Sequence, residues 1–160
     1  MRVIKTILVG IDYSEYSREA ARYAIYLART VKARLVFLYV VEQHAYLGSG
    51  LGPFHPAAVR DFVAQQEDFE RNSLETIQHF VGEFDLEGIE AEYCTMSGQP
   101  QSEIIRMARE RQADLIVVGS HGRTGLSQLL IGSVAEKVVR KASCPVLTVK
   151  LTDQPFTFSV

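Results

Sequence analysis

Glycines and a serine follow one apolar run of the sequence at a spacing that suits the binding of a phosphate group. An Ile- and Val-rich run ends at Gly119, and Gly122 and the pair Gly132-Ser133 come after it. Backbone N–H groups in a glycine-rich loop and at the start of a helix lack hydrogen-bond partners, and the helix dipole adds positive character there. We therefore predict a strand, a ligand-binding loop and a helix from Leu115 to Arg140.

The spacing of these glycines differs from the two common phosphate-binding fingerprints. The sequence contains no G-x-G-x-x-G motif, and no glycine is followed by Lys-Ser or Lys-Thr as a P-loop requires. A Rossmann dinucleotide site and a P-loop are therefore not predicted. A flexible crossover loop without a ligand is the alternative interpretation, but the preceding buried-type strand and the helix that opens at Gly132-Ser133 favour a ligand.

Three separated segments of the chain resemble the universal stress protein family. They are Ile7–Ser14, the glycine segment Val118–Ala135, and Cys144–Val149. The glycine segment has the spacing G-x2-G-x9-G-[ST] that marks the ATP-binding branch of this UspA-type family. The resemblance covers residues 1–150, which we interpret as one domain, followed by a C-terminal tail over 151–160.

Strand patterns and helix patterns alternate along the chain, which indicates right-handed βαβ units and a mostly parallel sheet. Strands are expected at Lys5–Gly10, Arg34–Val41, Ile89–Met96, Ala113–Gly119 and Pro145–Lys150, and helices at Glu15–Val31, Ala57–Phe84, Ser102–Arg111 and Ser133–Lys141. The third strand alternates with acidic residues, so we place it at an edge. The resemblance implies a single-domain α/β fold like that of adenine-nucleotide alpha hydrolases. This fold is an open parallel five-stranded sheet in the order 3-2-1-4-5, with helices on both faces.

In a sheet of this order, a ligand binds beyond the carboxyl ends of the strands, where the strand order reverses. The loops Gly10–Ser14 and Gly119–Gly132 meet at this point. The resemblance implies an adenine-nucleotide site there, formed by Gly10, Asp12, Val40, Val118, Gly119, Gly122, Arg123, Gly132, Ser133 and Val134.

Each of these residues has an implied role. Asp12 resembles the aspartate that contacts the nucleoside end of ATP, and Val40 the residue whose backbone meets the adenine edge. Gly10 and Val118 would line the adenine pocket, and the residues from Gly119 to Val134 resemble the phosphate and ribose cradle. A carboxylate can accept hydrogen bonds from ribose hydroxyls. Asp12 can also be a turn former or helix N-cap, although Ser14 is available as the cap.

Two further residues of the glycine loop allow more than one interpretation. Arg123 could neutralise phosphate charge or be a solvated loop residue. His121 has no Ser or Asp partner at the spacing of a catalytic triad and no nearby second histidine, so we interpret it as a residue that shapes the loop. We predict no catalytic residue and no metal-ligating residue. A Mg²⁺ ion would be carried with the phosphates.

Composition narrows the class of protein further. The net charge of −2 gives no sign of a nucleic-acid-binding surface. No apolar run approaches the ~20 residues of a membrane span, and the N-terminal run lacks the cleavage site of a signal peptide. Cys94 and Cys144 are far apart and lack metal-ligand spacing, which favours free thiols in a reducing cytoplasm. We expect a cytoplasmic protein that binds neither nucleic acid nor membrane.

Three functions are compatible with these features. The first is a regulatory module that binds ATP, changes the order of the loop Glu42–Pro56, and acts on protein partners whose identity is unknown. The resemblance implies a stress-response homodimer joined through Pro145–Lys150. The second is a slow ATP hydrolase, although no general base is evident. The third is an interaction protein of the same fold that does not bind nucleotide. The presence of all three glycines, Gly119, Gly122 and Gly132, argues against this function.

Overall fold

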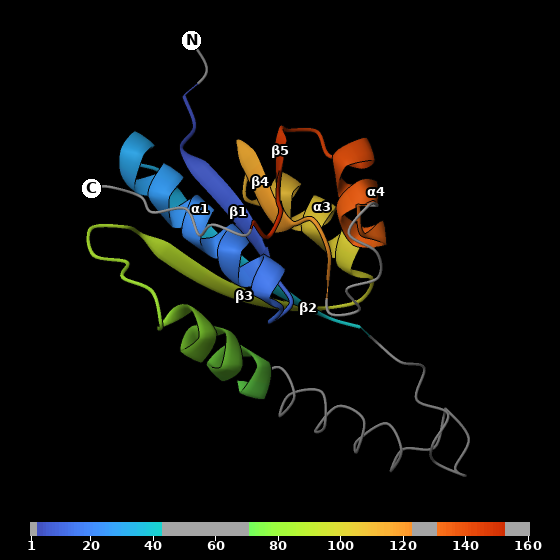
Figure 1. Ribbon diagram of the computed structural model, residues 1–160, viewed down its shortest axis with the longest axis horizontal. Helices are drawn as coiled ribbons and strands as arrows, with labels where there is room; N and C mark the ends of the chain where they lie inside the picture. Colours follow the sequence, from blue (N-terminus) through green and yellow to red (C-terminus); the bar gives the residue numbers. More distant parts are fainter. Residues whose placement is uncertain (1–2, 43–70, 123–130, 153–160) are drawn as a thin grey trace.

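The computed structural model describes residues 3–42, 71–122 and 131–152, and these form an open five-stranded parallel sheet with helices packed on it (Figure 1). The strands are β1 (Thr6–Ile11), β2 (Arg34–Val41), β3 (Ala91–Ser97), β4 (Leu115–Gly119) and β5 (Val146–Val149). The helices are α1 (Glu15–Val31), residues 71–81, α3 (Pro100–Glu110) and α4 (Ser133–Lys141). All neighbouring strands pair in parallel in the order β3-β2-β1-β4-β5, which confirms the predicted topology and the edge position of β3.

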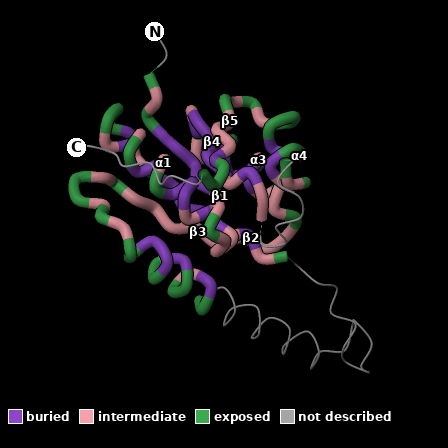
Figure 2. Tube along the Cα trace, viewed as in Figure 1, coloured by how far each residue is buried: buried purple, intermediate pink, exposed green. Residues whose placement is uncertain are grey.

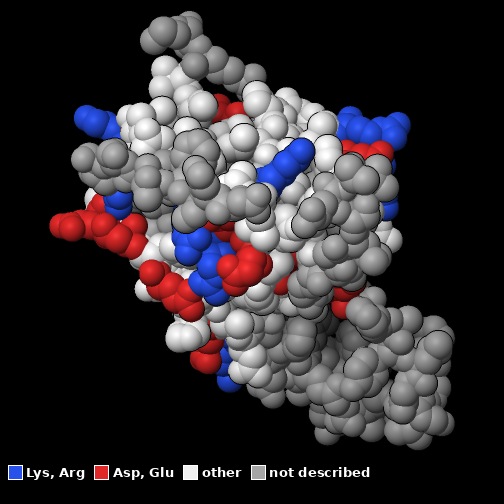
Figure 3. All heavy atoms as spheres, in the orientation of Figure 1, with Lys and Arg blue, Asp and Glu red and all other residues white. Residues whose placement is uncertain are grey.

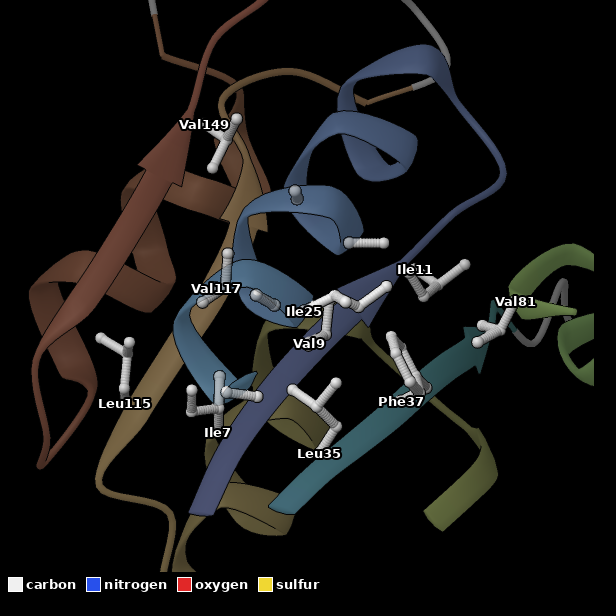
Figure 4. Close-up of a cluster of buried hydrophobic side chains, with 14 of the residues drawn as sticks. Ile7, Val9, Ile11, Ile25, Leu35, Phe37, Val81, Leu115, Val117 and Val149 are labelled. Atoms are coloured by element: carbon white, nitrogen blue, oxygen red, sulfur yellow. The ribbon is translucent and has the colours of Figure 1, made fainter. Parts of the chain in front are cut away.

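Alternate residues along the central strands face two separate hydrophobic layers. Ile7 and Val9 of β1 and Phe37 of β2 face a layer that contains α1 and the helix over 71–81 (Figure 4). Leu8 of β1 and Leu38 of β2 face a second layer that contains α3 and α4. These five side chains are 0% exposed, so the central strands are covered on both faces (Figure 2). The prediction of helices on both faces is confirmed.

Helix α1 has the predicted bounds, and local hydrogen bonds explain both ends. The Oγ atom of Ser14 accepts a hydrogen bond from the backbone N–H of Ser17 (3.1 Å), which makes Ser14 the N-cap as expected. At the other end Lys32 has a left-handed backbone, and the N–H of Ala33 donates to the carbonyl of Ala28 (2.9 Å). This start places the first turn of α1 directly after β1.

Several other boundaries differ from the prediction. Strand β3 begins at Ala91 and not at Ile89, because the N–H of Ile89 donates within a turn to the carbonyl of Leu86 (2.9 Å). Helix α3 begins at Pro100, two residues before the predicted start, and proline suits the first turn of a helix. Strands β1, β4 and β5 are also displaced by one or two residues at one or both ends.

The long second helix and two expected irregular segments are only partly within the described residues. The helix predicted over Ala57–Phe84 is present from 71 and ends at 81; residues 57–70 lie outside the described ranges. The same holds for the predicted loop Glu42–Pro56 beyond Glu42, and for residues 153–160 of the predicted tail. On the face shown in Figure 3, acidic and basic side chains of the described residues lie interspersed in small groups.

Candidate functional site

A cavity of about 320 Å³ lies at the carboxyl ends of β1, β2 and β4 and at the first turns of α3 and α4. Strand β1 pairs with β2 on one side and β4 on the other, so the cavity lies where the strand order reverses. The cavity is lined by Gly10, Ile11, Asp12, Ser17, Leu38, Tyr39, Val40, Glu42, Pro100, Ile104, Val118, Gly119, Ser120, His121, Gly122, Gly132, Ser133, Val134 and Ala135. Every site residue named from the sequence is among them except Arg123, which lies outside the described residues.

Asp12 forms a turn and also faces the glycine loop. Its Oδ1 atom accepts hydrogen bonds from the backbone N–H (3.0 Å) and the hydroxyl (2.5 Å) of Ser14. A Cβ atom placed on Gly122 would lie 3.0 Å from Oδ2 of Asp12, so this second oxygen is directed at the loop after β4. The interpretation of Asp12 as a turn former is confirmed, and its second oxygen is left facing the loop, so the two interpretations are compatible and the ligand role stays a prediction.

Gly119 is required for the close packing of α1. A Cβ atom at this position would lie 2.7 Å from Cβ and 2.9 Å from the carbonyl carbon of Tyr16. Both distances are too short for a real contact, and the second is to the backbone of α1. The absence of a side chain at Gly119 thus has a structural reason that is separate from its implied role in binding phosphate.

The start of α4 presents backbone amides to the cavity. The N–H of Gly132 donates to the carbonyl of Ser120 (2.7 Å), and the first hydrogen bond of the helix runs from Glu136 N–H to the carbonyl of Gly132 (2.9 Å). The N-cap residue Gly132 has no side chain that could accept from the amides of Val134 and Ala135. Since both residues line the cavity, this helix start can bind an anion there.

The opposite part of the cavity is apolar. A Cβ atom on Gly10 would lie 3.0 Å from Cγ1 of Val118 and 3.4 Å from Cδ1 of Ile104, so any side chain at Gly10 would enter this part. Ile104 and Pro100 come from α3 and were not predicted as site residues. Helical periodicity indicates that Ile104 faces inward, but it does not distinguish a core contact from a cavity wall.

His121 is held in place by two neighbours. Its Nδ1 atom lies 3.0 Å from the hydroxyl of Ser120, which is fully buried, and its ring centroid lies 5.0 Å from that of Tyr16. These contacts support its interpretation as a residue that shapes the loop. The described lining residues include two carboxylates, Asp12 and Glu42, and within the described ranges there is no cluster of three or more metal-ligating side chains.

Cys94 and Cys144 form no disulfide with each other, and both are partly buried. Burial, and secondly the hydrogen bond to Glu92, raise the pKa of the Cys94 thiol to about 11. At neutral pH this thiol is therefore protonated and a poor nucleophile.

Comparison with known proteins gives the family. The family model described as the universal stress protein family matches residues 4–150. The chain belongs to this family. Universal stress protein MJ0531 of Methanocaldococcus jannaschii is 34% identical over 147 residues, which cover 91% of this chain and 82% of the relative. The family resemblance noted from the sequence is thereby confirmed.

Solved structures agree with this universal stress protein fold. The structure of protein MJ0577, also from Methanocaldococcus jannaschii, has a TM-score of 0.76 at 25% identity, with 96% of this chain and all of that chain covered (100%). A universal stress protein in complex with cAMP has a TM-score of 0.64 at 22% identity and covers 94% of this chain and 100% of its own. No helix in the described part of the chain combines the length and the apolar character that crossing a membrane requires.

Proposed function

We propose that this universal stress protein is a regulatory module that binds an adenine nucleotide, with ATP as the preferred ligand, in the cavity at the ends of β1 and β4. The observation that carries the proposal is the convergence of two segments far apart in the sequence. The loop with Asp12 and the helix start at Gly132-Ser133 line one cavity with an apolar part and a part rich in backbone amides. A nucleotide has the same division into a flat base and a charged phosphate chain.

The chemistry of the lining fits such a ligand. The base would occupy the apolar part between Gly10, Val40 and Val118, and the phosphates would lie at the start of α4. The Oδ2 atom of Asp12 would accept hydrogen bonds from ribose hydroxyls. A Mg²⁺ ion would be held mainly by the phosphates, since magnesium commonly binds through phosphates and few protein ligands. The relative crystallised with cAMP supports the adenine-nucleotide class.

Binding without rapid turnover would distinguish a module from an enzyme. We expect ATP to co-purify with the protein, or to bind in calorimetric titration, with little phosphate released over hours. Substantial hydrolysis that is lost in Ser133→Ala would instead favour the slow ATPase. The absence of any adenine nucleotide binding would favour an interaction protein of the same fold.

Replacing Asp12 with asparagine is expected to weaken ATP binding by about 30-fold, because a charge-assisted hydrogen bond contributes about 2 kcal/mol. Asparagine keeps an oxygen that can accept from Ser14, so the turn before α1 is preserved. Calorimetric titration with ATP would measure the change.

Asp114→Asn is the matched control for this experiment. Its Oδ2 atom accepts from the N–H groups of Lys5 (2.9 Å) and Thr6 (3.1 Å), at the opposite end of β1 from the cavity. The same change of charge there should leave ATP affinity unchanged. Equal losses in both variants would argue against a specific role of Asp12 in the site.

We also propose a homodimer through the Pro145–Lys150 segment, whose strand β5 forms an edge of the sheet. The N–H of Ile116 donates to the carbonyl of Pro145 and that of Ser120 to the carbonyl of Val149. Because the hydrogen-bonding groups of successive residues in a strand point to opposite sides, the backbone of Thr148 faces the open edge. This edge can pair with a second copy of the strand.

Thr148→Pro is therefore expected to give monomers in light scattering, because proline removes an N–H from the open edge and leaves the hydrogen bonds to β4 in place. Val149 is a poor site for this test, since it is 4% exposed and packs in the core. Thr148→Val keeps the N–H and should remain dimeric. A dimer that persists in Thr148→Pro would reject this interface.

A further inference from the structure

Tyr13, which follows Asp12 in the loop between β1 and α1, has an unusual backbone conformation. Its φ angle is 65°, in the left-handed region that residues with a Cβ atom avoid. The other described non-glycine residues with positive φ are Lys32 and Gln112, which follow the helices α1 and α3, where such angles are common. Tyr13 has no such position, so its conformation must be held by the surrounding structure.

Aromatic contacts hold the Tyr13 side chain. Its ring centroid lies 4.5 Å from that of Tyr39 and 5.4 Å from that of Phe80, the second contact in an edge-to-face arrangement. The Tyr13 hydroxyl is buried and has no hydrogen-bond partner within the described part of the chain. Among the described residues, packing of the ring therefore keeps Tyr13 in place, and not a hydrogen bond from its hydroxyl.

These contacts join the cavity to the helix over residues 71–81. Tyr39 lines the cavity, whereas Phe80 lies on that helix and is 6% exposed. The same helix buries Ile77 and Val81 in the layer that contains α1. The guanidinium of Arg18, in α1, lies 4.7 Å from the centroid of the Phe80 ring. Tyr13 is thus covalently next to Asp12 and in direct contact with Phe80.

We infer that Tyr13 is a positioning residue that couples nucleotide binding in the cavity to the docking of helix 71–81 through Phe80. This inference rests on the proposed nucleotide-binding function. A ligand held by Oδ2 of Asp12 restricts the backbone on either side of Asp12, and so favours the left-handed conformation of Tyr13 that places its ring against Phe80. By linkage, the docked helix must then favour ligand binding by the same factor.

Hydrogen exchange with and without saturating ATP tests the coupling. In the unmodified protein, ATP should slow exchange of the amides of residues 77–82 by about fivefold or more, as well as those at the start of α4. Tyr13→Phe keeps the ring and should keep this effect. Tyr13→Asn, whose side chain tolerates the left-handed region, lacks the ring. In Tyr13→Asn, ATP should slow amide exchange at the start of α4 but leave the exchange of residues 77–82 unchanged.

The reciprocal measurement uses a residue remote from the cavity. When Tyr13 is present, Phe80→Leu should weaken ATP binding about fivefold. When Tyr13→Asn is already present, adding Phe80→Leu should not weaken ATP binding further. Phe84→Leu is the matched control: Phe84 contacts Phe80 with a centroid distance of 6.2 Å, and its replacement should leave ATP affinity unchanged. Exchange at β1 and β4 that is the same in all variants would establish that they are folded.

The outcomes separate this inference from the function on which it rests. Protection at the start of α4 without protection of residues 77–82 in the unmodified protein would overturn the coupling alone. So would equal protection of residues 77–82 in Tyr13→Asn, or an unchanged affinity in Phe80→Leu. If ATP protects no amide at either place and does not bind in titration, both the coupling and the proposed nucleotide site are wrong.

Discussion

Replacing Gly119 with alanine is expected to lower the free energy of unfolding by about 3 kcal/mol, at the upper end of the usual cost of overpacking. The new Cβ atom would lie 2.7 Å from Cβ and 2.9 Å from the carbonyl carbon of Tyr16. Relief requires the first turn of α1 to move away from β4, because a backbone atom cannot rotate aside as a side chain can. In a chain of this size the loss corresponds to a decrease in Tm of about 8 °C, which thermal or urea unfolding would measure.

Gly122→Ala provides a matched control three residues along the same loop. Among the described residues, its Cβ atom would meet only Oδ2 of Asp12 within 4 Å, at 3.0 Å. Stability should change by less than about 1 kcal/mol, since the side-chain oxygen can move and alanine also restricts the unfolded chain. ATP affinity should fall, because the displaced carboxylate is the proposed ribose ligand. Equal destabilisation by both substitutions would show that α1 does not limit the space at Gly119.

Replacing Gly10 with valine is expected to weaken ATP binding by about 100-fold, or about 2.7 kcal/mol. The Cβ atom alone would lie 3.0 Å from Cγ1 of Val118, and the two further methyl groups would occupy the apolar part of the cavity. A flat base that lies against Gly10 and Val118 would lose this space, so its binding would be weakened. Calorimetric titration would measure the affinity, and Gly10→Ala should give a smaller loss.

A second substitution tests whether the effect of Gly10→Val is one of volume. Val118→Ala removes the side-chain atoms that lie nearest to the new valine, and should recover part of the affinity lost in Gly10→Val. Damage to the β1–α1 turn would not be repaired in this way. If Gly10→Val binds ATP as tightly as the unmodified protein, the base does not occupy the apolar part of the cavity.

Much of the candidate site could be predicted from the sequence because its parts are local patterns. The glycine spacing before Ser133 and the carboxylate after the first strand both depend on neighbours in the chain. Alternating strands and helices indicate a parallel sheet, and the reversal of strand order in such a sheet indicates which loops meet. The parallel sheet follows from short-range periodicity and a rule of chain connection, whereas the strand order and the roles of the site residues were implied by the family resemblance. None of these inferences requires the position of a side chain.

Other features depend on contacts between distant segments and could not be predicted. The walls from Pro100 and Ile104 depend on how α3 lies on the sheet, and the need for glycine at Gly119 depends on how closely α1 approaches β4. The starts of β3 and α3 differ from the predicted ones. A turn hydrogen bond at Ile89 delays the start of β3, and Pro100 in the first turn of α3 moves the start of that helix forward.

The sequence by itself determined the parallel α/β class, because this class depends on periodicity and on the rules of chain connection. The strand order, and with it the location of the cavity, followed from the resemblance to the family. Only the tertiary structure decided that Asp12 directs one oxygen to the turn and one to the loop, and that Tyr13 takes a left-handed backbone between Tyr39 and Phe80. Both are set by packing between residues far apart in the chain, and no local pattern records the distance between them.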